Sequence, residues 1–211
     1  MATHAFVNVD LAEAAALADL NGVAIDLESV RRLSKCLADF FASGKVDMDV
    51  VDAFSTAILI CYSRPFMFGV RERIGGDILA ALTARQRKLH EQFMEWRNKH
   101  IAHSVNPFED NQVVAYYNDE KVSAEGLQSI SVQQNRLIGL GTQDLNTIQE
   151  LSEALLKHVN SRIDAEKTNI LGIIRSMPIK EVMSKGVKAP CAPGMESVNV
   201  VRKKKNRKGA A

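Results

Sequence analysis

A short run near the middle of the chain gathers four residues able to bind anions or move protons. Arg97 and Asn98 are followed by His100 and His103. Histidine titrates near neutral pH, and arginine can hold two phosphate oxygens and spread their charge. Asn98 adds a neutral donor and acceptor, and a helix C-terminus favours a protonated imidazole. These groups suffice for RNA cleavage by the ribose 2′-hydroxyl, with acid–base help and charge stabilisation but no metal.

The helix predicted to carry these residues also has a stripe of large apolar side chains that leads into the histidines. Steps of four and three residues keep one face of a helix aligned. Such steps join Leu89, Phe93, Trp96, His100 and His103. A stripe of this kind packs against another helix, either in the same chain or in a partner. We predict that the first four of these residues form a homodimer interface.

Arg97 flanks that stripe, and its position relative to His103 limits what the pair can do. On an ideal helix, two residues six apart point about 120° away from each other. They would share one phosphate only if the helix loosens near Ala102, or if a second copy of the chain brings its own pair to a common cleft. The alternative from residue types alone is a hydrogen-bonded core histidine beside a solvated arginine.

Hydrophobic periodicity predicts the helices that must position this cluster. Their approximate bounds are 9–20, 26–44, 47–64, 77–102, 142–163 and 167–176, and the first is expected to end near Asn21 and Gly22. Asp26 and Thr142 are the expected N-caps. Between the two longest helices the helical pattern stops, and residues 106–123 predict a short hairpin or an irregular loop. Gly139 and Gly141 predict a turn, because they lack the spacing and the lysine of a phosphate loop.

The predicted fold is all-α: a bundle of four to five main helices with an irregular or hairpin insertion and a disordered basic C-terminal tail. Residues 1–185 form the bundle domain, and residues 186–211 form the tail. The tail contains six cations within seven residues, namely Arg202, Lys203, Lys204, Lys205, Arg207 and Lys208. Without them, 21 basic residues face 25 acidic ones, so the remainder is mildly acidic. Such a tail either binds RNA phosphates or only keeps the chain in solution.

Composition argues against several classes of protein. No window holds eighteen consecutive apolar residues, and the N-terminus lacks the basic start of a signal peptide, so no membrane contact is expected. Cys36 and Cys61 are predicted core thiols and Cys191 lies in the tail, an odd count that fits neither a disulfide scaffold nor a zinc site. A reducing, cytoplasmic compartment fits best. No carboxylate cluster is arranged for magnesium, and no cofactor is expected.

The run from Trp96 to Ser104, WRNKHIAHS, resembles the signature of the HEPN superfamily. That signature is an arginine, a polar residue after it, and a histidine after a short gap. The form RNKxIAHS after an aromatic residue is especially similar to HEPN-like proteins of phage-defence and abortive-infection systems. The arginine-to-histidine spacing alone is a weak signal, since it occurs again from Arg85 to His90. The specific part is the conjunction of the asparagine, the aromatic and the IAHS ending late in a long helix.

The resemblance implies an α-helical bundle that dimerises through the motif helix and, in active members, a metal-independent ribonuclease. It assigns the catalytic positions to Arg97, Asn98 and His103. We therefore expect an endoribonuclease that acts as a toxin or phage-defence effector, with RNA as substrate, a second copy as partner and an antitoxin or other regulatory protein as a further partner. The alternative is a non-catalytic dimerisation or interaction module of the same fold, since the superfamily includes inactive members.

Overall fold

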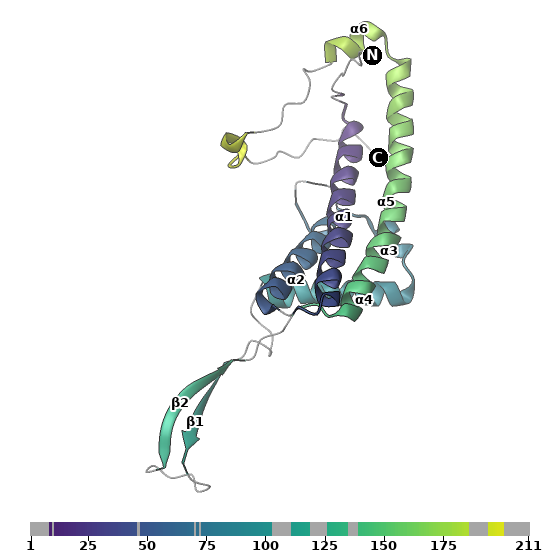
Figure 1. Ribbon diagram of the computed structural model, residues 1–211. Coiled ribbons are helices and arrows are strands. Elements are labelled where there is room, and N and C mark those ends of the chain that lie inside the picture. Colours follow the sequence, from purple (N-terminus) through teal and green to yellow (C-terminus); the bar gives the residue numbers. More distant parts are fainter. Residues whose placement is uncertain are drawn as a thin grey trace.

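The protein is mainly helical, and this confirms the predicted all-α class (Figure 1). The structure, a computed structural model, describes residues 9, 11–45, 47–69, 71, 73–102, 111–118, 126–134, 139–185 and 194–200. In chain order the elements are α1 (Ala14–Ala42), α2 (Met48–Ser63), η1 (Arg64–Phe66), α3 (Gly76–Ala80), α4 (Ala84–Trp96), η2 (Arg97–Ala102), β1 (Asn111–Tyr117), β2 (Leu127–Gln134), α5 (Thr142–Ser176), α6 (Ile179–Lys185) and η4 (Met195–Ser197). Within the described ranges, no helix is both long and apolar enough to cross a membrane. The domain boundary at residue 185 stays a prediction.

The first two predicted helices are one continuous helix, α1, of 29 residues. The expected break at Gly22 and the expected cap at Asp26 are therefore wrong. Gly22 stays helical at a cost of about 1 kcal/mol relative to alanine, and its missing side chain leaves room for Arg71. A Cβ at position 22 would lie 2.6 Å from Arg71 Nη1. Asp26, one turn further along, is buried and accepts a hydrogen bond from Arg71 Nη2 at 2.7 Å.

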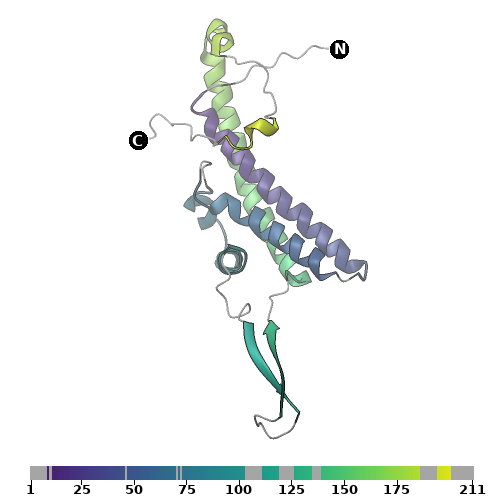
Figure 2. The same ribbon diagram turned by 90° about the vertical axis from the view of Figure 1, so that its left-hand side faces the viewer.

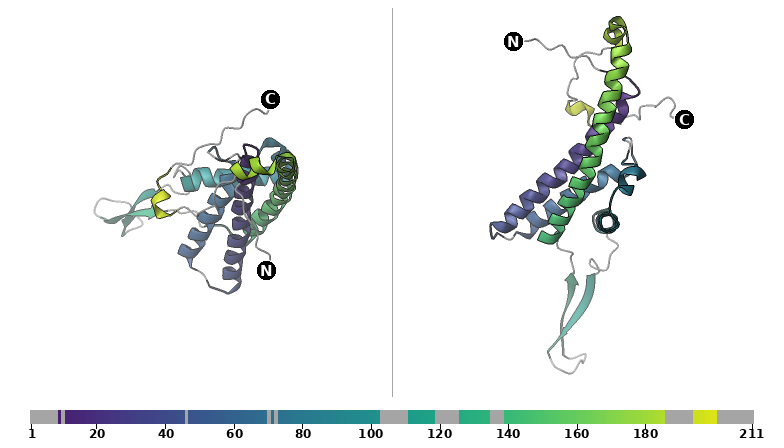
Figure 3. Two further views of the ribbon diagram at one scale, coloured as in Figure 1. Left: turned by 90° about the horizontal axis from the view of Figure 1, so that it is seen from above. Right: turned by 90° about the vertical axis from the view of Figure 1, so that its right-hand side faces the viewer.

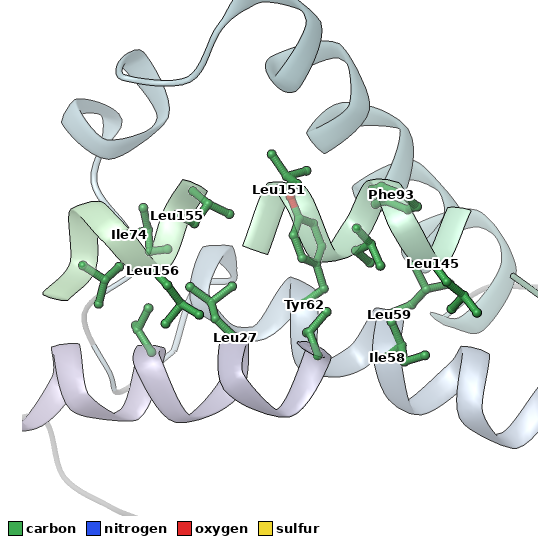
Figure 4. Packing of buried hydrophobic residues seen from close by; sticks show 14 of the residues in the cluster. Leu27, Ile58, Leu59, Tyr62, Ile74, Phe93, Leu145, Leu151, Leu155 and Leu156 are labelled. Carbon is green, nitrogen blue, oxygen red and sulfur yellow. The ribbon is translucent and has the colours of Figure 1, made fainter. Parts of the chain in front are cut away.

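The core lies between α1, α2 and α5, with α1 and α5 side by side and antiparallel (Figures 1 and 2). Each helix contributes side chains at helical spacing to one buried face. The largest fully buried ones from these three helices are Leu27, Leu37, Ile58, Tyr62, Leu145, Ile148, Leu151 and Leu155. Figure 4 shows part of this cluster interdigitating between the helices. Burying one such side chain stabilises the fold by about 1.5–3 kcal/mol.

α5 runs for 35 residues, so the two helices predicted at 142–163 and 167–176 are one. No glycine or proline separates them. Ile170 is buried two turns after the buried Ile163, so the apolar face continues across the expected gap. Across the bundle, Arg31 Nη2 lies 3.1 Å from Glu153 Oε1 and forms an ion pair between α1 and α5.

α2 forms where the sequence predicts it. The Asp47 carboxylate accepts hydrogen bonds from two backbone N–H groups of the first turn, and the helix ends just before Pro65. Its cysteine, Cys61, is half-buried. Cys36 in α1 is exposed, so its predicted core position is wrong, because it falls beside the buried face of that helix.

The long helix predicted over 77–102 is divided into three pieces. α3 ends at Ala80 and α4 begins at Ala84, where Thr83 and Gln86 form a capping box. Thr83 Oγ1 accepts from the Gln86 N–H at 3.2 Å, and Gln86 Oε1 accepts from the Thr83 N–H at 2.9 Å. The Thr-x-x-Gln pattern signals this start in the sequence. α4 is seen nearly end-on in Figure 2, so it crosses the long helices at a steep angle.

The predicted hairpin exists, but its second strand comes later than expected. β1 contains the run QVVAYY, and it pairs antiparallel with β2 at residues 127–134, which lie after the predicted range of 106–123. In register, Val113 faces Val132 and Ala115 faces Ile130, so these four share one face. That face is exposed, with Val113 at 73% and Ile130 at 67%. The hairpin lies beyond the ends of the long helices in Figures 1 and 2, and it projects to one side of them when seen from above (Figure 3, left).

Gly139 and Gly141 lie in the irregular segment that leads into α5, and the turn predicted there is not assigned over residues 139–141. Gly139 has φ +27°, and a Cβ there would lie 2.6 Å from Val51 Cγ1 and 2.7 Å from Ser55 Oγ on α2. Gly141, rather than the predicted Thr142, is the N-cap of α5, and its N–H donates to an Asp144 carboxylate oxygen at 3.0 Å. The N–H of Gly141 is thus satisfied within the protein rather than directed at a phosphate.

Gly139→Ala should destabilise the protein by about 1–3 kcal/mol, because the new methyl group meets α2 and the backbone conformation disfavours a side chain. The matched control is Gly172→Ala in α5, where nothing lies within 4 Å of an added Cβ. That change should stabilise the helix by about 0.5–1 kcal/mol. Urea unfolding followed by circular dichroism measures both. A Gly139→Ala midpoint equal to that of the wild type would contradict the packing described for this segment.

Candidate functional site

The motif residues lie on η2, a π-helix that continues α4 without a gap. A π-helix closes hydrogen bonds five residues apart instead of four, so the helix widens, and such turns are frequent at functional sites. The widening starts at Arg97 itself. His103 lies outside the described residues, so its approach to Arg97 stays a prediction.

Arg97 and Asn98 are joined to each other by their side chains. Arg97 Nη1 donates a hydrogen bond to Asn98 Oδ1 at 3.0 Å, and Arg97 is half-buried while Asn98 is exposed. The amide oxygen is neutral, so it orients the guanidinium without cancelling its charge. An aspartate at this position would form an ion pair and compete with a bound anion. The pair can therefore present an oriented positive charge to a phosphate.

Arg97 faces a pocket of about 410 Å³ that the sequence analysis missed. Its lining residues are Ile60, Ser63, Arg64, Met67, Phe68, Gly69, Arg71 and Arg97. The sequence signal was the presence of three arginines, Arg64, Arg71 and Arg73, within ten residues of the stretch between α2 and α3. Their spacing gives no sign of a relation to Arg97, and only the fold brings two of them beside it.

The pocket carries more positive than negative charge among the described residues around it. Asp26 of α1 is not among its lining residues, but it lies 2.7 Å from Arg71 Nη2 and 3.6 Å from Arg64 Nη1. Three arginines thus line the pocket, and two of them lie close to one buried carboxylate. Such a surplus favours an anionic ligand, and arginine is the side chain best shaped to hold a phosphate.

The apolar part of the predicted dimer stripe packs inside its own chain. Phe93 is only 2% exposed, and its ring meets those of Tyr62 and Trp96 edge-on, at centroid distances of 5.8 and 6.0 Å. Leu89 and Trp96 are partly buried against the same core. Phe93 therefore has no surface left for a partner, which corrects its assignment to a dimer interface. The backbone of His100 lies in η2.

Several predicted site residues lie outside the described part of the chain. His103 is one, and the six tail cations Arg202, Lys203, Lys204, Lys205, Arg207 and Lys208 are the others. The convergence of His103 with Arg97 and the contact of the tail with RNA both stay predictions. Over the ranges that the structure describes, no group of three or more histidine, cysteine, aspartate or glutamate side chains could hold a metal ion.

His90, the histidine of the second arginine-to-histidine pair, packs against the core. His90 Nδ1 and Tyr62 Oη are hydrogen bonded at 2.8 Å, and the His90 ring meets Phe66 edge-on at 4.4 Å. Burial lowers the pKa of His90 and raises that of Tyr62. Arg85, in contrast, is exposed. His90 therefore matches the alternative of a hydrogen-bonded core histidine. This distinguishes the copy of the spacing from Arg85 to His90 from the copy that begins at Arg97.

The lowered pKa of His90 predicts that acid weakens the fold. The unfolded chain takes up a proton at its ordinary pKa of about 6.5, while the folded chain resists it, so stability falls as the pH drops through that value. One group contributes at most about 1.4 kcal/mol per pH unit, and less here because the ring is partly exposed. His90→Gln should lose less unfolding free energy than the wild type between pH 7.5 and 5.5 in urea titrations. Equal losses would contradict this role.

Comparison with known proteins adds no relative: no family model, no curated protein and no solved structure matches the chain. The likeness to HEPN proteins therefore depends on the signature from Trp96 to Ser104 and on the helical fold around it. Membership of that superfamily stays a prediction.

Proposed function

We propose that the protein is a metal-independent endoribonuclease of HEPN type that acts as a toxin or phage-defence effector. One observation carries the proposal: the Arg97 guanidinium, oriented by Asn98, stands on a widened helical turn at the edge of a cationic pocket. A buried or ion-paired arginine at this position would have argued for a structural role. The Arg97 guanidinium is half-exposed and its hydrogen-bond partner, Asn98, is neutral, which supports phosphate binding instead.

In the proposed reaction, the ribose 2′-oxygen attacks the adjacent phosphorus and the 5′-oxygen of the next nucleotide leaves. The products are a 2′,3′-cyclic phosphate and a free 5′-hydroxyl. Arg97 holds the non-bridging oxygens and stabilises the charge that develops on them. His103 acts as general acid or base, giving a proton to the leaving oxygen or taking one from the 2′-hydroxyl. Asn98 is a positioning residue for Arg97.

A second copy of the chain would complete this site. Arg97 and His103 are six residues apart, so a symmetric pair of motif helices supplies each arginine with a histidine from the other subunit. The basic residues at 202–208 would strengthen RNA binding without sequence preference. An antitoxin or other regulatory protein is the further partner expected of a toxin.

Arg97→Ala and His103→Ala should each reduce RNA cleavage by about 100-fold or more, the scale of losing charge stabilisation or acid–base help. Helical content by circular dichroism should not change. The matched control is Arg85→Ala, which removes an exposed arginine from the second arginine-to-histidine pair and should leave cleavage at the wild-type rate. Cleavage should also continue in excess EDTA. Equal activity of wild type and His103→Ala would remove the proposal.

The alternative is a non-catalytic interaction module, and one observation favours it. The strands of the hairpin carry no charged residue, and their apolar face is exposed. A two-stranded hairpin of this kind is marginally stable alone, and an uncharged edge strand invites pairing. A second copy of this chain is the suitable occupant, because two uncharged hairpins meet without electrostatic repulsion.

Ile130→Ser should weaken self-association at least about tenfold, since each copy loses an apolar contact worth roughly 1.4 kcal/mol or more. The control is Gln133→Ser, on the other face of the same strand. Sedimentation velocity over a range of concentrations measures both. A wild-type protein that stays monomeric, or an Ile130→Ser variant that associates as the wild type does, contradicts this alternative.

A further inference from the structure

We propose that the arginine-lined pocket is a nucleotide subsite, which binds one unpaired RNA nucleotide next to the phosphate held by Arg97. The inference rests on the proposed ribonuclease function and names the substrate as single-stranded RNA. In this arrangement Arg64 holds a second phosphate, and Phe68 supplies the surface on which the base stacks. The pocket volume of about 410 Å³ falls in the usual range of small-molecule sites.

The two arginines bound to Asp26 differ in how firmly they are held. Arg71 is 26% exposed and 2.7 Å from the carboxylate, so it neutralises the buried charge. Arg64 is 58% exposed and 3.6 Å away, so its interaction with the carboxylate is weak. An RNA phosphate can therefore recruit Arg64 while Arg71 keeps Asp26 paired. Arg64 and Arg97 then remain as two cations that face the same pocket.

Phe68 makes the pocket specific for a nucleotide rather than for any anion. Its side chain is 85% exposed at the pocket lining, where water contact with an aromatic ring is unfavourable. The Arg73 guanidinium lies 4.2 Å from the ring centroid, and this cation–π contact orients the ring. Proteins bind single-stranded RNA by stacking bases on such aromatic rings beside arginines. In a duplex the bases stack on each other, so the subsite selects unpaired RNA.

The test measures binding separately from cleavage. The probe is a short fluorescent single-stranded RNA in which every 2′-hydroxyl is methylated, which blocks the proposed reaction, and the full-length protein binds it in an anisotropy titration. Phe68→Ala should weaken binding about 5- to 100-fold, the effect of losing one stacked base. Arg64→Gln should also weaken it and lower the slope of log affinity against log salt by about 0.7. The corresponding duplex should bind less tightly than the single strand.

Two control variants match these changes. Tyr116→Ala removes an exposed aromatic ring on the hairpin, and Arg175→Gln removes an exposed arginine near the end of α5; both should bind as the wild type does. A probe with one 5-iodouridine, irradiated in the complex, should cross-link to the peptide that contains Phe68. The basic tail is present in every variant, so RNA binding through the tail does not distinguish one variant from another. The position of the cross-link reports on the pocket itself.

The outcomes separate the subsite from the ribonuclease. If Phe68→Ala and Arg64→Gln bind like the wild type, or if cross-links form only within residues 202–208, the subsite is overturned even when the wild type cleaves unmethylated RNA. If the wild type cleaves no RNA but its binding depends on Phe68 and Arg64, the ribonuclease proposal fails and the subsite stands as an RNA-binding site. Wild-type protein that binds no single-stranded RNA overturns the subsite.

Discussion

The buried carboxylate of Asp26 is the constraint on which the arrangement of the pocket depends. A carboxylate inside a helical bundle costs several kcal/mol unless it is paired, so a cation must reach it from another segment. Arg71 does so, and it passes over Gly22 because no side chain stands there. The stretch between α2 and α3 is thereby held against α1, and Arg64 and Phe68 are carried to the side where Arg97 lies.

A second set of contacts fixes the motif helix. Tyr62 of α2 is fully buried, its hydroxyl is hydrogen bonded to His90, and its ring packs edge-on against Phe93. Phe93 lies one turn before Arg97, so this aromatic cluster anchors α4 to the core immediately ahead of η2. The large side chains predicted to hold two subunits together instead hold Arg97 at a fixed position within one subunit. Such rigid support is what a phosphate-binding residue needs, because small displacements cost much of the effect.

The class of the fold and most helices could be predicted from the sequence because apolar residues recur at helical spacing over long stretches. Errors arose where a local signal was outweighed by a distant contact. Gly22 looked like a helix end, but Arg71 packs against it; Asp26 looked like a cap, but it pairs with that same arginine. Neither interaction can be inferred from neighbours in the chain, since the partner lies 45 residues away.

The candidate site, like the fold, could be predicted only in part from the sequence. Arg97 and Asn98 could be found from residue types and spacing, because their interaction is local and needs only one helical turn. The pocket beside them could not, since Arg64 lies in the short helix η1 and Phe68 in the irregular stretch after it, both about 30 residues before the motif in the chain. The capping box at Thr83 is a sequence signal that the prediction of one helix over 77–102 did not take into account. It marks the start of α4 within that range.

Burial of the stripe also changes what a two-subunit site requires. A stable protein interface covers about 800 Å² on each partner. With Phe93 enclosed and Leu89 and Trp96 half-buried, the motif helix alone has too little apolar surface to supply that area. A dimer that pairs Arg97 with the histidine of its partner must therefore recruit other surfaces. The uncharged face of the hairpin exposes Val113, Ile130 and Val132, and it follows the motif in the chain. Subunit association and assembly of the site would then be one event, so a lone chain would carry Arg97 and its pocket but not a complete catalytic pair.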